Sequence, residues 1–281
     1  MLSPLFSRWL LASLLWLAGC NVWLNVGGEP TPPPDPDPMP PRYQPARDVR
    51  WQLQLQGAVT PQSGTQLLEI DLFDTPESQL ITWRRQGIRL LCYFSAGTLE
   101  IWRPDVASLP ASVRGEPLPA WPGEYWLDVR ASSVRDLMRS RLDLAQRKGC
   151  DAVDADNVDC FLQNSGFALN ASDQLDYNRF LAHEAHRRGL AIALKNNLTQ
   201  IADLVADFDL AVNEQCHAYQ ECVRLAPFVR AGKPVLNIEY DPRFVADAAS
   251  RRQLCDEAQQ EGLQTRVLTP ALDGTLLHSC F

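Results

Sequence analysis

Short apolar runs alternate with amphipathic segments along the chain from about Trp51 onward. Within residues 134–145, apolar side chains recur at i, i+3 and i+4, which predicts a helix that ends near Gly149. Further helices are predicted over residues 75–86, 172–188 and 244–261. The apolar runs predict eight strands, at Leu67–Leu72, Ile88–Phe94, Tyr125–Val129, Ala152–Asp156, Leu190–Lys195, Leu210–Asn213, Val235–Tyr240 and Gln264–Leu268.

Strands that alternate with helices predict an α/β fold with a parallel sheet. Eight repeats in about 220 residues favour a single-domain (β/α)8 TIM-type barrel over residues 47–281. An open, doubly wound sheet is the alternative. No glycine-rich phosphate loop follows the first predicted strand, which argues against a dinucleotide-binding fold.

The first 46 residues have a composition unlike that of the predicted barrel. Arg8 precedes an apolar run that is too short to span a bilayer but fits the core of a signal peptide over residues 1–19. The run ends in Leu-Ala-Gly-Cys20, which resembles a bacterial lipobox and predicts a lipid anchor on Cys20. Asn at position 21 favours the outer membrane of the bacterial cell envelope over the inner membrane. An ordinary secretory signal or a buried amphipathic helix is the alternative. Residues 20–46 are rich in proline, which predicts an extended tether.

The formal net charge is −8, so nucleic acid is not an expected partner. We expect a monomer that meets the membrane only through its lipid anchor. Lipidation of Cys20 leaves seven of the eight cysteines in an oxidising compartment, where disulfides persist. Cys92 and Cys150 have the pattern of small, buried apolar residues. Two disulfides are predicted, Cys216–Cys222 and Cys255–Cys280.

Acidic and other polar residues gather where most of the predicted strands end. In a barrel of this kind the carboxyl ends of the strands meet at one mouth, where the chemistry takes place. Asp154 and Asp156 lie two residues apart on one strand and therefore share a face. Paired carboxylates are typical of glycoside hydrolysis, in which one carboxyl group must keep a raised pKa. Five aromatic residues are candidates for sugar stacking or for core packing: Tyr93, Trp102, Trp121, Trp126 and Tyr240.

Other hydrolytic chemistries find less support in the sequence. His183 and His186 are spaced i, i+3 on a charged helix, without the H-E-x-x-H pattern of zinc proteases. No G-x-S-x-G motif is present for a serine nucleophile. We therefore expect no metal and no cofactor.

Nine motifs in order resemble glycoside hydrolase family 114, whose characterised activity is endo-α-1,4-polygalactosaminidase. The resemblance covers about residues 51–280. It implies a (β/α)8 barrel that cleaves α-1,4-linked galactosamine-containing exopolysaccharide, with Asp156 and Glu214 as the catalytic acids. This chain departs from the family pattern at 154–155 and 160–161, which read Asp-Ala and Cys-Phe. The motifs are Trp51–Gly57, Asp71–Thr75, Cys92–Gly97, Glu100–Asp105, Trp121–Asp128, Asp156–Asp159, Lys195–Asn196, Asn213–Cys216 and Glu239–Tyr240.

The resemblance and the residue pattern lead to one mechanistic hypothesis. Asp156 is predicted to be the nucleophile and Glu214 the general acid and then base of a retaining reaction, which requires the two carboxyls to lie about 5–5.5 Å apart. The acidic protein suits a cationic sugar polymer. A non-catalytic polysaccharide-binding lipoprotein, or a glycosidase for another α-linked amino sugar or galactoside, is the alternative. The predicted binding residues are Asp71, Tyr93, Asp128, Asn157, Lys195, Asn196, Glu239 and Tyr240.

Overall fold

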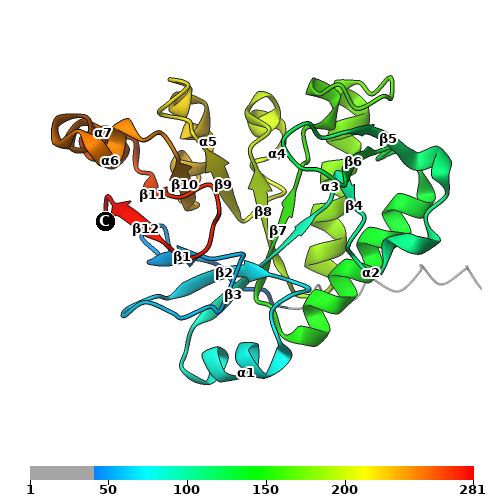
Figure 1. The fold of residues 1–281 in the computed structure, drawn as a ribbon, viewed down its shortest axis with the longest axis horizontal. Helices are drawn as coiled ribbons and strands as arrows, with labels where there is room; N and C mark the ends of the chain where they lie inside the picture. Colours follow the sequence, from blue (N-terminus) through cyan, green and yellow to red (C-terminus); the bar gives the residue numbers. More distant parts are fainter. Residues whose placement is uncertain (1–40) are drawn as a thin grey trace, which may run out of the picture. The chain divides into compact units, whose positions relative to one another are not determined.

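Nine strands form one curled sheet in the computed structural model, which describes residues 41–281. Eight strands run parallel, and the last one, β12, pairs antiparallel with β11. The predicted (β/α)8 barrel is confirmed (Figure 1). In sheet order the strands are β1 (Trp51–Leu53), β2 (Leu67–Asp71), β3 (Arg89–Ser95), β7 (Ala152–Asp156), β8 (Ala191–Lys195), β9 (Leu210–Glu214), β10 (Val235–Glu239), β11 (Gln264–Leu268) and β12 (Leu276–Ser279).

The two ends of the sheet are joined by loop contacts. The backbone N–H groups of Leu55 and Gln56, which follow β1, both donate to the carbonyl of Leu272, which follows β11. Lower in the barrel, the indole of Trp51 donates to the carbonyl of Gln264 at 3.1 Å. These bonds bring the last parallel strand next to the first.

The strand predicted at Tyr125–Val129 does not belong to the barrel, and this part of the prediction is wrong. Residues 124–127 form β6, which pairs antiparallel with β4 (Thr98–Glu100) and β5 (Arg114–Pro117) in a separate small sheet. In the barrel, β3 pairs directly with β7. The eighth parallel strand is β1, which has three residues and is fully buried. A local apolar pattern predicts a strand but does not specify its partner.

The helices match the predicted spacing, with one interruption. α2 (Ser132–Lys148) ends at Gly149, whose φ of 80° lies in the left-handed region that favours glycine. The helix predicted over 244–261 is two helices, because the side chain of Asp247 accepts from two backbone N–H groups and starts a new one. The remaining helices are α1 (Glu77–Arg85), α3 (Ala171–Arg187), α4 (Ile201–Leu204), α5 (Ala226–Arg230), α6 (Arg243–Ala246) and α7 (Ala248–Glu261). The single 3-10 turns are η1 (Val106–Ser108), η2 (Ala111–Val113), η3 (Cys160–Leu162), η4 (Leu198–Gln200) and η5 (Cys222–Leu225).

The predicted signal peptide, the predicted lipid anchor on Cys20 and most of the predicted tether lie within residues 1–40, outside the described part of the chain. Of the tether, residues 41–46 have no regular structure, and Arg42 pairs with Asp209 of the barrel at 2.9 Å. Within residues 41–281, no helix combines the length and the apolar character needed to cross a bilayer.

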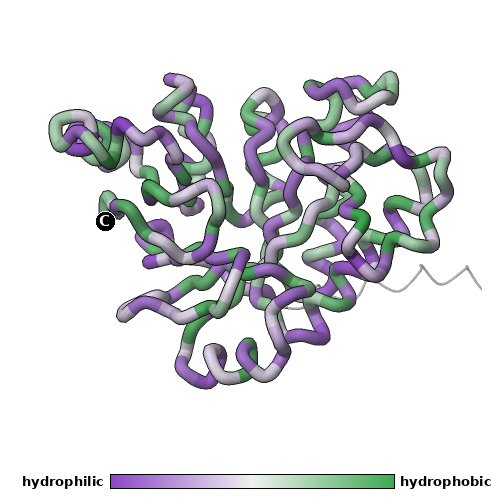
Figure 2. Tube along the Cα trace, in the orientation of Figure 1, coloured by the Kyte–Doolittle hydropathy of each residue, from purple (hydrophilic) through white to green (hydrophobic). Residues whose placement is uncertain are grey.

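Side chains alternate between the two faces of each barrel strand. Leu67 and Leu91 belong to the core inside the barrel, whereas Leu68 and Cys92 belong to the core between strands and helices. Positions on both faces are apolar, so hydrophobic stretches lie between hydrophilic ones along the trace in Figure 2. This alternation decides which strand-end residues face the interior.

Three disulfides link the described chain. The predicted pairs Cys216–Cys222 and Cys255–Cys280 are confirmed. Cys92 and Cys150 are buried as predicted, but they form a third disulfide and are not free thiols. Cys92 lies on β3, and Cys150 lies just before β7. Their Cα atoms are 6.0 Å apart, although the two residues are 58 positions apart in sequence, because β3 and β7 are neighbours in the sheet.

Candidate active site

A cleft of about 770 Å³ lies across the carboxyl ends of the barrel strands. Its floor comes from the barrel, and part of its wall comes from the small sheet and the loops around it. Carboxyl groups greatly outnumber cations in this lining. The charged residues that line the cleft are Glu69, Asp71, Asp74, Glu100, Glu124, Asp156, Asp159, Glu214, Arg103 and Lys195.

Asp156, Lys195 and Glu214 end three successive strands, β7, β8 and β9, and meet on the cleft floor. The Nζ of Lys195 lies 3.1 Å from Oδ1 of Asp156 and 3.3 Å from Oε2 of Glu214. One buried ammonium therefore bridges the two carboxylates that the sequence singled out.

The chain turns sharply after each of these three residues. Asn157, Asn196 and Gln215 follow them directly, and their φ values of 61°, 49° and 61° lie in the left-handed region. Asparagine tolerates this region better than most residues, because its short side chain bonds locally. The side chain of Asn196 also accepts from the backbone N–H of Glu214 on the neighbouring strand, at 2.9 Å. Each strand therefore ends directly after its functional side chain.

Two tyrosines hold the two carboxylates from opposite sides. Tyr93 of β3 donates to Oδ2 of Asp156 at 3.1 Å. Tyr240, just after β10, donates to Oε1 of Glu214 at 2.6 Å. Asn196 adds a longer bond to Oε2 of Glu214 at 3.3 Å. Each carboxylate thus receives several donors, and its geometry is fixed before a ligand arrives.

The charges on the floor shift one another's pKa. Burial alone would lower the pKa of Lys195, but Asp156 and Glu214 outweigh it and raise that pKa well above its ordinary value. Burial would raise the pKa of Glu214, yet Lys195 and the bond from Tyr240 hold it below its ordinary value. Glu214 is therefore ionised at neutral pH.

A second pair of acids lies inside the barrel below this floor. Glu69 of β2 and Asp154 of β7 are almost fully buried. Burial raises the pKa of Asp154 to about 7, and burial next to Asp154 raises the pKa of Glu69 well above its ordinary range. At neutral pH this pair retains a proton that two exposed carboxyls would have lost.

Asp71 lines the cleft, but a cation that the sequence did not reveal holds its carboxylate. Arg103 is buried and places Nη2 2.6 Å from Oδ2 of Asp71 and Nε 2.9 Å from Oε2 of Glu100. Arg103 thereby ties the small sheet to the end of β2. Arg103 lies outside every predicted helix and strand. The only sequence feature that includes it is the Glu100–Asp105 motif.

Three predicted binding residues lie outside the cleft lining; of these, Tyr240 bonds to Glu214, whereas Asp128 and Glu239 bond to neither of the two carboxylates on the cleft floor. Asp128 follows the small sheet and is bound by Arg130 at 2.8 Å. Glu239 lies on the face of β10 opposite to Ile238, so it points away from the barrel interior. Its carboxylate instead accepts from the backbone N–H groups of His217 and Ala218. The structure does bring the other predicted residues together around the two carboxylates: Asp71, Tyr93, Asn157, Lys195, Asn196 and Tyr240.

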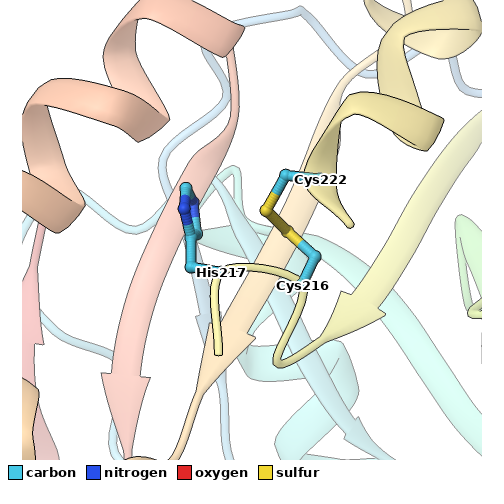
Figure 3. A group of neighbouring side chains, drawn as sticks. All are labelled: Cys216, His217 and Cys222. Atoms are coloured by element: carbon cyan, nitrogen blue, oxygen red, sulfur yellow. A yellow bond between two sulfur atoms is a disulfide. The ribbon is translucent and has the colours of Figure 1, made fainter. Parts of the chain in front are cut away.

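The loop after Glu214 holds a compact group of Cys216, His217 and Cys222 (Figure 3). The two sulfur atoms are bonded to each other, so the group offers no thiolate to a metal ion. His217 packs towards Glu257 of α7, at 3.7 Å. The group stabilises the loop that begins at Glu214.

Comparisons with known proteins agree with this geometry. The model of a family described as glycoside-hydrolase family GH114 matches residues 34–280. The structure of Ega3 from Aspergillus fumigatus in complex with galactosamine is 36% identical, with a TM-score of 0.80, and the match covers 86% of this chain and 99% of that chain. The glycoside hydrolase domain of PelA from Pseudomonas aeruginosa shares the fold at 18% identity and a TM-score of 0.62, over 81% of this chain and 96% of that chain. No curated protein matches the chain.

Proposed function

Since the chain belongs to glycoside-hydrolase family GH114 and is therefore a glycoside hydrolase, we propose that it cleaves α-1,4-linked galactosamine-containing polysaccharide at internal bonds. Asp156 and Glu214 are the two catalytic carboxylates of this proposal. The observation that carries it is their shared contact with Lys195 on the floor of an open cleft. A module that only binds polysaccharide has no need of such a pair.

The spacing of the two carboxylates supports a retaining reaction. Both oxygens contact the same ammonium, at 3.1 and 3.3 Å, so their separation is at most the sum of these distances. This limit, which applies to Oδ1 of Asp156 and Oε2 of Glu214, is compatible with the ~5–5.5 Å of retaining enzymes.

In the first step, an Asp156 oxygen bonds to the anomeric carbon while the glycosidic C–O bond breaks and Glu214 protonates the leaving oxygen. In the second step, Glu214 takes a proton from water, and the water oxygen displaces Asp156 from the sugar. Because Glu214 is ionised at neutral pH, it must gain a proton before it can act as the acid of the first step. The ionised form favours the alternative in which the roles are exchanged, with Glu214 as the nucleophile and Asp156 as the acid.

The charge of the cleft supports a cationic substrate. The lining contains eight carboxyl side chains and two cations. Deacetylated galactosamine units carry ammonium groups, which such a surface attracts. Ega3, the solved relative at 36% identity, was crystallised with galactosamine.

Digestion of defined α-1,4-galactosamine oligomers tests the proposal. We expect cleavage at internal bonds, and a loss of about 10³-fold or more in kcat for Asp156→Asn and for Glu214→Gln, with the fold retained. Asp128→Asn is the matched control, because Asp128 lies outside the cleft lining and pairs with Arg130, and it should stay active. Intact oligomers after incubation with the wild-type protein would overturn the proposal.

Rescue of the variants separates the two assignments of roles. If Asp156 is the nucleophile, azide restores turnover to Asp156→Ala, whose short side chain leaves room for it, and yields the β-glycosyl azide, inverted relative to the α-linked substrate. In that case Glu214→Gln retains its first step on substrates with an activated aryl leaving group, which needs no acid. The opposite pattern would assign the attack to Glu214.

We also propose that the enzyme is anchored in the bacterial cell envelope through a lipid on Cys20, with the outer membrane as its site. The support is the lipobox-like sequence at 17–20 and the proline-rich segment behind it. In cells grown with labelled palmitate, the full chain should become labelled and Cys20→Ser should not. Equal labelling of the variant would contradict the anchor.

A further inference from the structure

Glu124 stands out among the acids of the cleft. It lies on β6 of the small sheet, lines the cleft and is only 6% exposed. Its Oε1 accepts from the hydroxyl of Thr98 and, at 3.2 Å, from Nδ2 of Asn157. Within residues 41–281, no donor bonds to its second oxygen, Oε2. This oxygen is not sealed from solvent, and because Glu124 lines the cleft, Oε2 is free to accept from a ligand there.

The neighbours of Glu124 make its position unfavourable. Glu100 lies directly opposite Glu124 in the pairing of β4 with β6. Like charges in directly opposed positions destabilise a sheet. Arg103 neutralises Glu100 through two contacts and Asp71 through another pair, but no cation of the described chain lies within ion-pair distance of Glu124. Among the three acids of the small sheet and Arg103 cluster, Glu100, Asp71 and Glu124, it is Glu124 that lacks a positive partner in the part of the chain that the structure describes.

Glu124 is also close to the reaction centre. Asn157 donates through its side chain to Glu124 and through its backbone N–H to Oδ1 of Asp156, at 2.7 Å. Asn157 thus bonds to both Glu124 and Asp156, so these two carboxylates lie one residue apart in space. In a galactosamine ring the ammonium is on C2, next to the anomeric carbon that Asp156 would attack.

From this geometry we propose that Glu124 is the specificity residue that binds the C2 ammonium of the sugar held beside Asp156. The inference rests on the proposed function and adds to it the group that distinguishes an amino sugar from a neutral sugar. The ammonium supplies the cation that the protein does not, through a charge-assisted bond to Oε2. Burial raises the pKa of Glu124 to about 7; Glu100 and Asp156 add to this rise, and the hydrogen bond from Thr98 and the charge of Arg103 oppose it. An incoming ammonium would favour the ionised form.

Titration with monosaccharides tests the inference without relying on turnover. Binding of galactosamine and of galactose is followed by NMR, which measures millimolar affinities, for the wild type and for Glu124→Gln. The glutamine keeps the size and the acceptor for Thr98 and Asn157 but removes the charge. We expect the wild type to prefer galactosamine, and Glu124→Gln to reduce this preference about tenfold or more without changing the affinity for galactose. Glu116→Gln is the matched control on the same sheet, because Glu116 is exposed and outside the cleft lining, and it should keep the preference.

The outcomes are separable from those for the proposed function. An unchanged preference for galactosamine in Glu124→Gln would overturn the inference, as would an equal loss of affinity for both sugars. If the glutamine variant does not fold, Glu124→Asp is used instead, because it moves the charge back by one methylene. It should reduce the preference for galactosamine and leave the affinity for galactose unchanged. Hydrolysis of the oligomers is measured on the same preparations. A wild type that prefers galactosamine but cleaves no oligomer would contradict the proposed function and leave the binding role of Glu124 standing.

Discussion

Lys195 is the residue on which the charge balance of the cleft floor depends. Its ammonium contacts both proposed catalytic carboxylates and lies near the buried Asp154. Burial by itself would favour the neutral form of Glu214, and Lys195 is the first of the groups that reverse this effect. The lysine thus acts as a fixed counter-ion and keeps the carboxylates at a set distance.

Replacing Lys195 by methionine should reduce kcat/KM about 100-fold and move the pH profile. Without the ammonium, burial raises the pKa of Glu214, so Glu214 becomes ionised only at higher pH. The limb of the kcat/KM profile that reports Glu214 should therefore move to higher pH. Lys233→Met is the matched control, because Lys233 bonds to the carbonyls of Val205 and Phe208 outside the cleft. A limb that stays in place in Lys195→Met would show that this lysine does not set the ionisation of Glu214.

The loop after Glu214 is the element that most directly positions a catalytic side chain. The disulfide Cys216–Cys222 closes it, and the buried Glu239 accepts from the backbone N–H groups of His217 and Ala218, at 2.9 and 3.3 Å. Asn237 donates to the same carboxylate at 3.1 Å. Glu239 therefore acts on the reaction through the loop and not through the substrate.

We expect Glu239→Gln to lower kcat about tenfold and to leave KM nearly unchanged. An amide has a single acceptor oxygen, so one buried N–H of the loop loses its partner, at a cost of about 1–3 kcal/mol. The loop, and with it Glu214, would lose its fixed position. Glu257→Gln is the control, because Glu257 reaches the same loop only from its exposed place on α7. A raised KM with an unchanged kcat would instead indicate that Glu239 contacts the substrate.

Sequence patterns predicted most of these elements but not how distant ones combine. Seven predicted strands lie in the barrel within about one residue of their predicted ends, because a buried parallel strand is a continuous apolar run. β1 was missed because it has three residues, and Tyr125–Val129 was misplaced because its pattern does not reveal an antiparallel partner. Strand alternation already places Glu239 on the face opposite to Tyr240, so its position outside the cleft was accessible from the sequence.

The residues that the sequence did not reveal owe their roles to contacts between elements. Arg103 binds acids from β2 and β4, and Glu124 meets Asn157 across the cleft. Cys92 and Cys150 pair only because β3 lies beside β7. No local pattern encodes such neighbours, whereas Asp156 and Glu214 stand at strand ends that the pattern does predict.

Across the whole molecule, the three disulfides constrain segments of very different length. Cys92–Cys150 spans 58 residues, Cys255–Cys280 spans 25 and Cys216–Cys222 spans 6. In the chain-entropy account, such crosslinks restrict the unfolded chain by ~4, ~3.5 and ~2 kcal/mol respectively. Only the shortest lies beside a proposed catalytic residue. Stability and activity should therefore depend on different disulfides.

Three double variants, in which each pair of cysteines becomes alanine, test this separation. The melting temperature should fall most for the Cys92 and Cys150 variant and least for the Cys216 and Cys222 variant, because the longer crosslink removes more entropy from the unfolded chain. The order for kcat, measured well below every melting temperature, should be the reverse, because the short loop begins at Glu214. Cys160→Ala, which removes a buried thiol outside any disulfide of the described chain, is the control for melting temperature only, because its thiol donates to the carbonyl of Asn157. A loss of kcat that follows the loss of stability through the series would show that the Cys216–Cys222 loop has no special part in positioning Glu214.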